Sequence, residues 1–172
     1  MRTILTILLC SAALFAADPI RRAPGFSLMD SNGQLHDLAD YRGKVVVLEF
    51  MQTTCPHCAA FAPILQQVQQ KYGDKIAIIA VTDPPDNLST LSAYVAGHKV
   101  TYPVVLDCGQ AAYSYVRSRT LNFPHVYLID GAGMIRNDYE YGPLTRDIFE
   151  GKALFLEIDR LLGGAATPAK RR

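Results

Sequence analysis

The stretch VVVLEFMQTTCPHCAAFAPIL, residues 45–65, constrains the fold of this 172-residue chain more than any other. It begins with a short, continuous and largely β-branched run, which is typical of a strand covered on both faces. Cys55 and Cys58 follow, and residues 56–72 carry apolar side chains at helical spacing. A buried strand that leads directly into a helix predicts an α/β unit with the cysteine pair at the junction.

Similar strand and helix patterns alternate along the rest of the chain. They predict strands at 75–82, 101–107, 125–130 and 134–142, and helices at 87–99, 109–119 and 145–162. Gly151 is expected to break the last helix into two pieces. An Asn32-Gly33 turn predicts a hairpin in front of the first buried strand. We therefore expect one α/β domain over 18–162, with a central mixed sheet flanked by helices.

The first seventeen residues, MRTILTILLCSAALFAA, form a secretory signal pattern. The apolar run is short for a membrane span, which needs roughly 20 residues, so we expect cleavage and export to the periplasm or another extracytoplasmic space. Retention as an uncleaved membrane anchor is the alternative. The large Leu9 argues against lipid attachment at Cys10. Residues 163–172 are expected to be a disordered tail.

Composition argues against nucleic acid as a partner. The formal charge is +1 and no basic block lies inside the folded region, so the chain lacks the electrostatic footprint of a nucleic-acid-binding protein. With 49% hydrophobic residues, the chain can bury a sizeable core without disulfide staples, and we expect a monomer. Export would place the remaining cysteines, Cys55, Cys58 and Cys108, where disulfides persist, and an odd number leaves at least one unpaired.

The cysteine pair has three possible interpretations: a redox couple, a pair of metal ligands or a structural disulfide. At the first turn of a helix, Cys55 would meet free backbone N–H groups and the positive end of the helix dipole, and both favour a thiolate. Pro56 suits the first helical position, where a missing N–H costs nothing. Cys58, one turn deeper, should be more buried. The arrangement favours Cys55 as the sulfur that attacks or is attacked and Cys58 as the resolving sulfur.

The strand, the pair and Pro63, eight residues after Cys55, resemble a thioredoxin-type active site. The stretch LNFPHVYLIDGAGMI resembles the cis-proline strand of that fold. The resemblance implies a cis bond before Pro124 and a backbone at Phe123 that pairs with a substrate strand; Pro56 and His125 would also line the substrate site. An inert histidine at the strand edge is the alternative for His125.

Residues 23–50 and the YPVVLD strand with its helix resemble the redoxin, or AhpC/TSA, branch of that superfamily, which includes exported TlpA- and ResA-like thiol–disulfide oxidoreductases. The resemblance implies a thioredoxin-like sandwich with an N-terminal β-hairpin and an inserted βα unit. It also implies disulfide exchange with protein cysteines through a mixed disulfide, with no cofactor beyond the cysteine pair and with a membrane or periplasmic redox partner.

The motif CPHC is instead similar to that of DsbA, a periplasmic disulfide donor. A histidine at position 57 would stabilise the Cys55 thiolate and so make the disulfide a stronger oxidant. The alternative is a solvent-facing residue without a role. Because the rest of the chain resembles reductants, the direction of exchange stays open.

Further candidates lie outside the motif. Glu49, six residues before Cys55, stands where related proteins carry an acidic residue beneath the resolving cysteine, and it could exchange a proton with Cys58; otherwise it faces water at a strand edge. Cys108 is a third redox thiol or, more commonly, a buried structural cysteine. The tyrosines are interpreted as packing: Tyr113, Tyr115, Tyr139 and Tyr141.

Two other functions remain open. In a copper-binding or copper-delivery protein, Cys55, His57 and Cys58 would supply soft ligands, and Cys108 or His125 are the candidates that would complete the set. No second CxxC completes a tetrahedral set, so no metal is predicted. A peroxiredoxin-type peroxidase would carry threonine where Gln52 stands. Ala59, in place of histidine, excludes covalent haem attachment.

Overall fold

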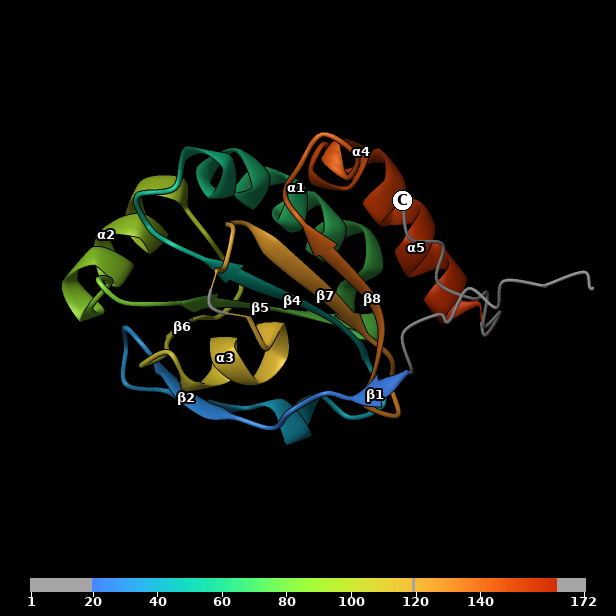
Figure 1. Ribbon diagram of the computed structural model, residues 1–172, viewed down its shortest axis with the longest axis horizontal. Coiled ribbons are helices and arrows are strands. Elements are labelled where there is room, and N and C mark those ends of the chain that lie inside the picture. The colour runs from blue at the N-terminus through green and yellow to red at the C-terminus, as the bar shows by residue number, and fades with distance from the viewer. Residues whose placement is uncertain (1–19, 119, 164–172) are drawn as a thin grey trace, which may run out of the picture.

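The computed structural model describes residues 20–118 and 120–163 (Figure 1). The predicted signal segment 1–17, with Cys10, and all but the first residue of the predicted tail lie outside the described residues. Strands occupy β1 (Arg21–Arg22), β2 (Ser27–Asp30), β3 (Leu35–Asp37), β4 (Val45–Met51), β5 (Ile76–Thr82), β6 (Val104–Leu106), β7 (His125–Ile129) and β8 (Met134–Glu140). The α-helices are α1 (Pro56–Tyr72), α2 (Leu88–His98), α3 (Gln110–Val116), α4 (Arg146–Phe149) and α5 (Lys152–Leu162).

The strands form one mixed sheet in the order β1-β8-β7-β4-β5-β6-β2-β3. β4 runs parallel to β5 and antiparallel to β7, and β5 runs parallel to β6. All seven residues of β4 are buried, as the apolar run predicts for a central strand. The predicted mixed central sheet is confirmed, and the C-terminal end of its central strand leads directly to Cys55.

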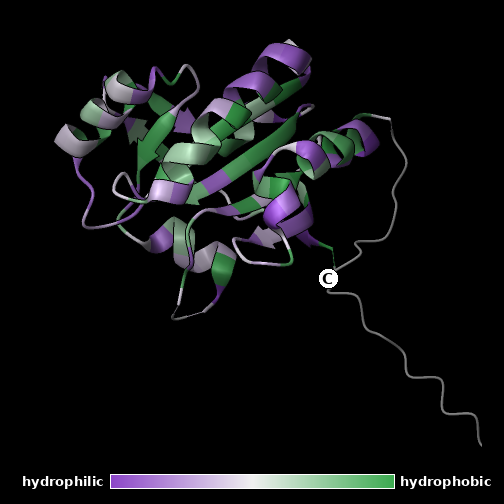
Figure 2. Ribbon diagram, turned by 90° about the horizontal axis from the view of Figure 1, so that it is seen from above, coloured by the Kyte–Doolittle hydropathy of each residue, from purple (hydrophilic) through white to green (hydrophobic). Residues whose placement is uncertain are grey.

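Helices cover both faces of the sheet (Figure 1). One core lies beneath α1, α2, α4 and α5 and includes Val47, Leu65 and Leu154. The other lies beneath α3 and includes Phe50 and Tyr115. Figure 2 shows the apolar strands enclosed between helices whose outer faces are more polar. Side chains that alternate along β4 therefore belong to two different cores.

The predicted hairpin and inserted unit are both present. The β2–β3 turn contains Gly33, whose positive φ of 80° favours glycine. β2 pairs with the inserted strand β6, so the hairpin extends the sheet beyond β6. In β3 the buried side chain is His36, while Leu35 is 59% exposed.

The predicted break at Gly151 separates α4 from α5. Gly151 has a φ of 93°, and a Cβ added there would lie 2.9 Å from Cγ2 of Ile64 in α1. Only glycine meets both conditions without strain. Across residues 20–163, leaving out 119, the structure contains no helix with the length and apolar character of a membrane span.

Candidate active site

Cys55 caps the N-terminus of α1. Its backbone is extended, with φ −78° and ψ 116°, and its Sγ accepts the N–H of Cys58 at 3.2 Å. Pro56 occupies the first helical turn, as predicted, and is exposed. The capping bond brings a backbone donor to the Cys55 sulfur, where a thiolate is stabilised by the positive end of the helix.

The two cysteine side chains differ in exposure. Cys55 is partly exposed, whereas Cys58 has no exposed surface, and both are free thiols. Burial raises the pKa of the Cys58 thiol far above its ordinary value, and the charge of Glu49 adds to this effect. The expected greater burial of Cys58 is confirmed. A partner in solvent therefore reaches the Cys55 sulfur first.

Glu49 lies in the middle of β4, on the face that packs against α1. Its paired neighbour in β7, Val126, belongs to the same core as Cys58. The side chain has no exposed surface, and neither carboxylate oxygen has a hydrogen-bond partner among the described residues. Burial raises the pKa of Glu49 to about 8. The alternative of a glutamate at a strand edge is wrong.

Two buried tyrosines lie near Glu49 and Cys58, and the sequence alone did not identify either tyrosine. Tyr94 of α2 donates its hydroxyl to the carbonyl oxygen of Cys58 at 3.4 Å. The hydroxyl of Tyr102 is buried without a partner in the described residues. The pKa of each tyrosine is raised, by burial first and then by the charge of Glu49. No sequence motif predicts the positions of these tyrosines, because they depend on how α2 and β6 pack.

The predicted cis peptide bond is present between Phe123 and Pro124. Phe123 is partly buried and packs against both cores. The paired part of β7 begins at His125, so the backbone of Phe123 lies beyond the sheet ladder. The carbonyl oxygen of Pro124 accepts the backbone N–H of Tyr141 at 3.1 Å.

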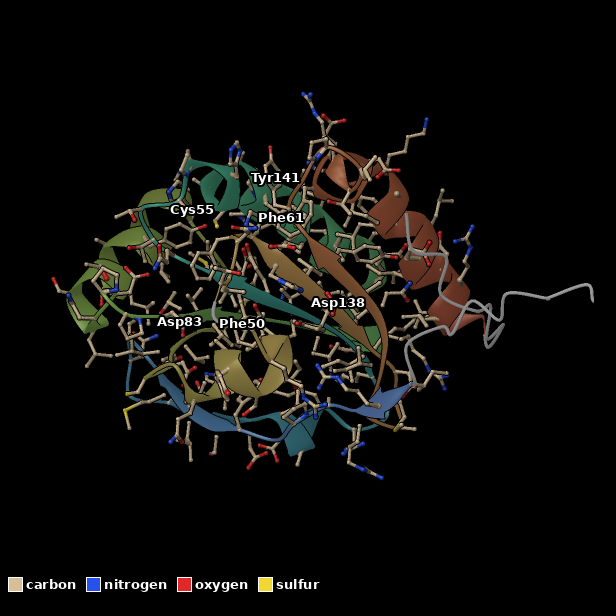
Figure 3. All side chains as sticks on the ribbon, in the orientation of Figure 1. Phe50, Cys55, Phe61, Asp83, Asp138 and Tyr141 are labelled. Atoms are coloured by element: carbon tan, nitrogen blue, oxygen red, sulfur yellow. The ribbon has the colours of Figure 1, made fainter. Side chains whose placement is uncertain are left out.

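The structure places His125 away from the cysteines. His125 pairs with Phe50 in β4 and therefore points to the α3 face, opposite Glu49. Its Nε2 lies 2.6 Å from Oδ1 of Asp138, and its ring stacks on Tyr127. The labelled Phe50 and Asp138 lie below Cys55 in Figure 3. The expectation that His125 lines the substrate site is therefore wrong. Side chains alternate along β7, and this alternation directs His125 to the face opposite the cysteines.

His57 is exposed and stacks on Tyr141, with ring centroids 4.2 Å apart and an angle of 22° between the rings. Figure 3 shows Tyr141 and Phe61 on the same side of the sheet as Cys55. Tyr141 was expected only to pack, and its contact with the cysteine motif could not be inferred from the sequence because 84 residues separate it from His57 (141 − 57).

Comparisons with known proteins agree with this geometry. Residues 19–138 match the AhpC/TSA family. The chain belongs to the AhpC/TSA family. Thioredoxin-like protein YneN of Bacillus subtilis is 30% identical over 141 residues, which cover 81% of this chain and 79% of YneN. The thiol–disulfide oxidoreductase ResA of Geobacillus thermodenitrificans is 32% identical over 117 residues, covering 66% of this chain and 64% of ResA.

A solved structure also resembles this AhpC/TSA-family chain. It is a Chlorobium tepidum protein described as a candidate thiol:disulfide interchange protein, DsbE. The two share 26% identity and superpose with a TM-score of 0.73, over 86% of this chain and all of the other. The thioredoxin-like fold of the redoxin branch, which the sequence resemblance implied, is confirmed.

In this AhpC/TSA-family chain the turn before Cys55 is tied to the neighbouring loop. The N–H of Thr53 donates to Oδ2 of Asp86 at 2.8 Å, and the Thr53 hydroxyl donates to the other carboxylate oxygen. Asp86 also accepts the hydroxyl of Thr90 in α2 at 3.1 Å. The carboxylate thereby fixes the β4–α1 turn against the start of α2. Sequence reasoning missed this residue.

Cys108 follows β6 and is exposed. The interpretation as a buried structural cysteine is wrong, because the chain leaves the sheet at Asp107, whose buried carboxylate accepts the N–H of Cys108 at 2.8 Å. Among residues 20–118 and 120–163, no group of three or more His, Cys, Asp or Glu side chains is arranged to hold a metal ion.

Proposed function

We propose that the chain is a thiol–disulfide oxidoreductase that exchanges disulfides with protein cysteines through the Cys55–Cys58 couple. The observation that carries this proposal is the asymmetry of the pair: Cys55 is accessible and capped by an N–H, whereas Cys58 is fully buried directly behind it. The relative ResA, a thiol–disulfide oxidoreductase, supports the same reaction class, and the relative YneN is described as thioredoxin-like. The pair itself is the redox group, so no bound cofactor is required.

The exchange proceeds in two steps. The Cys55 thiolate attacks a disulfide of the client, forming a mixed disulfide and releasing one client sulfur as a thiolate. Cys58 then gives up its proton and attacks the Cys55 sulfur, which releases the second client thiolate. The client gains two electrons and the cysteine pair becomes a disulfide. In the opposite direction the same bonds form and break in reverse order.

Glu49 is proposed to take the proton that Cys58 must lose. Both side chains are buried on the same face of the sheet, where solvent does not reach them. With its pKa raised to about 8, Glu49 can both accept and release a proton near neutral pH. The high pKa of Cys58 makes such a base necessary for the resolving step.

The client is proposed to bind as an extended segment beside Pro124. The backbone of Phe123 lies outside the paired part of β7 and is available to pair with an added strand. The exposed Pro56 directly follows Cys55 within the motif. These contacts use backbone groups and one proline ring, so they favour many protein clients over one small molecule.

We further propose that the protein acts outside the cytoplasm, with a membrane or periplasmic redox partner. The support is the signal pattern in residues 1–17 together with the disulfide chemistry, which needs a compartment where disulfides persist. Whether the couple donates or removes disulfides depends on its reduction potential.

Exchange with a disulfide-containing protein and consumption of hydrogen peroxide distinguish this proposal from a peroxidase. We expect the reduced protein to cleave disulfides of insulin much faster than it consumes peroxide with a thiol donor, and Cys55→Ser to abolish cleavage. Gln52 stands where a peroxiredoxin-type peroxidase would carry threonine, and its side-chain amide donates to the carbonyl oxygen of Pro84 at 3.2 Å. Peroxide consumption as fast as insulin cleavage would overturn the proposal.

A further inference from the structure

Tyr141 lies next to the cysteine motif although it belongs to a distant part of the sequence. It follows β8 directly, is half-buried, and presents the face of its ring to the imidazole of His57 at 4.2 Å. His57 is exposed and has no other aromatic contact among the described residues. The stack on Tyr141 therefore restrains the orientation of the His57 ring, two residues after Cys55.

Tyr141 is held in place independently of His57. Its ring packs edge-on against Phe149 of α4, with centroids 5.3 Å apart. Phe149 in turn packs on Phe61 at 5.2 Å, and Phe61 stands one helical turn after His57 in α1. On the other side, the Tyr141 N–H is bonded to the carbonyl of Pro124. The tyrosine is thus a fixed support that joins the cis-proline loop to the cysteine motif.

We propose that Tyr141 is a positioning residue that holds His57 beside Cys55 and thereby makes the cysteine couple more oxidising. An aromatic face attracts a cation by about 0.5–1 kcal/mol at exposed sites. The charged form of His57 is the form that stabilises a thiolate on Cys55, so the stack favours the reduced state, in which that thiolate exists. This inference rests on the proposed exchange function.

The relevant equilibrium is the oxidation of glutathione by the protein. The Cys55–Cys58 disulfide takes two electrons from two glutathione thiols, giving glutathione disulfide, a Cys55 thiolate, a Cys58 thiol and one released proton. Any contact that stabilises the charged pair of His57 and Cys55 increases this equilibrium constant. The support from Tyr141 should therefore be measurable without any knowledge of the natural client.

The test is a double-mutant cycle on that equilibrium constant, measured by trapping free thiols after equilibration with glutathione buffers. We expect Tyr141→Leu to lower the constant about two- to fivefold, a shift of about 9 to 21 mV for two electrons, and Tyr141→Phe, which keeps the aromatic face, to retain it. In a His57→Ala background, Tyr141→Leu should have no further effect. Tyr141→Met provides a second non-aromatic variant if the leucine variant does not fold.

The results separate this inference from the function on which it rests. An unchanged constant in folded Tyr141→Leu or Tyr141→Met, or an equal loss with and without His57, would overturn the role of Tyr141 while leaving exchange intact. If the unmodified protein failed to exchange disulfides with glutathione at all, the proposed function itself would fail.

Discussion

Cys55 and Cys58 lie on one helical turn, yet only Cys55 is accessible to a partner. The difference arises because Cys55 is the N-cap of α1, outside the helix proper, whereas Cys58 points into the core that contains Glu49. In the proposed exchange, the accessible sulfur meets the client, and the buried sulfur lies on the sheet face that also holds the buried carboxyl of Glu49.

Glu49 predicts a pH dependence of stability in the reduced protein. Burial raises its pKa from 4.5 to about 8, so between these values the folded protein holds a proton that the unfolded chain releases. The free energy of unfolding must then fall as the pH rises. Relative to Glu49→Gln, the unmodified protein should lose about 3 to 5 kcal/mol between pH 5 and 8.5, measured by urea denaturation.

Two comparisons control for other carboxyl groups in this pH dependence. Asp83, whose pKa is raised to about 6, is present in both proteins, so its contribution cancels in the difference. Glu150→Gln changes an exposed carboxylate and should reproduce the unmodified pH curve. Parallel pH curves for the Glu49→Gln and unmodified proteins would show that Glu49 is not a buried proton carrier.

The elements that form the site meet at the ends of three strands. β4 leads to the cysteine motif, β5 leads to the loop that contains Asp86, and β7 begins after the cis-proline. Asp86 joins the first two of these connections through its bonds to Thr53. The geometry of the motif thus depends on a carboxylate from a different loop.

Loss of the Asp86 carboxylate should loosen this junction. Asp86→Ala removes the acceptor for the N–H and hydroxyl of Thr53, and we expect the free energy of unfolding to fall by about 2 kcal/mol. Asp74→Ala is the matched control, because Asp74 is exposed and makes no side-chain hydrogen bond within the described part of the chain. Equal stability of the two variants would contradict a structural role for Asp86.

Local sequence patterns predicted most of the elements because each pattern depends on neighbours along the chain. The apolar run of β4, the proline after Cys55 and the glycine at position 151 determine local structure by themselves. The contacts of Tyr141 and Asp86 could not be predicted, since they join segments more than thirty residues apart. His125 was misplaced because a resemblance gives the position of a residue, whereas the face it points to depends on strand alternation.

At the scale of the whole molecule, the sheet separates two cores. Cys58 of the candidate site belongs to the core beneath α1 and α5. Leu154 of α5 is fully buried in this core, although α5 is far from the cysteines in sequence. The C-terminal helix therefore supports the same layer that holds Glu49 and Cys58 (Figure 1).

Truncation of Leu154 should reveal this support. Leu154→Ala is expected to lower the free energy of unfolding by about 3 kcal/mol, through lost burial and the cavity that remains. Leu156→Ala, on the same helix but 54% exposed, should cost less than about 1 kcal/mol. Urea denaturation gives both values, and a similar loss in the two variants would show that α5 does not belong to the core.

The central claim is that Cys55 exchanges and Cys58 resolves, and trapping of the mixed disulfide tests it most directly. In a Cys108→Ser background, which removes the exposed third thiol, Cys58→Ser should accumulate a mixed disulfide with glutathione on Cys55, located by peptide mass spectrometry. The matched Cys55→Ser variant should remain unmodified, because Cys58 is fully buried. Modification of Cys58 at a similar rate, or no adduct on Cys55, would contradict the account.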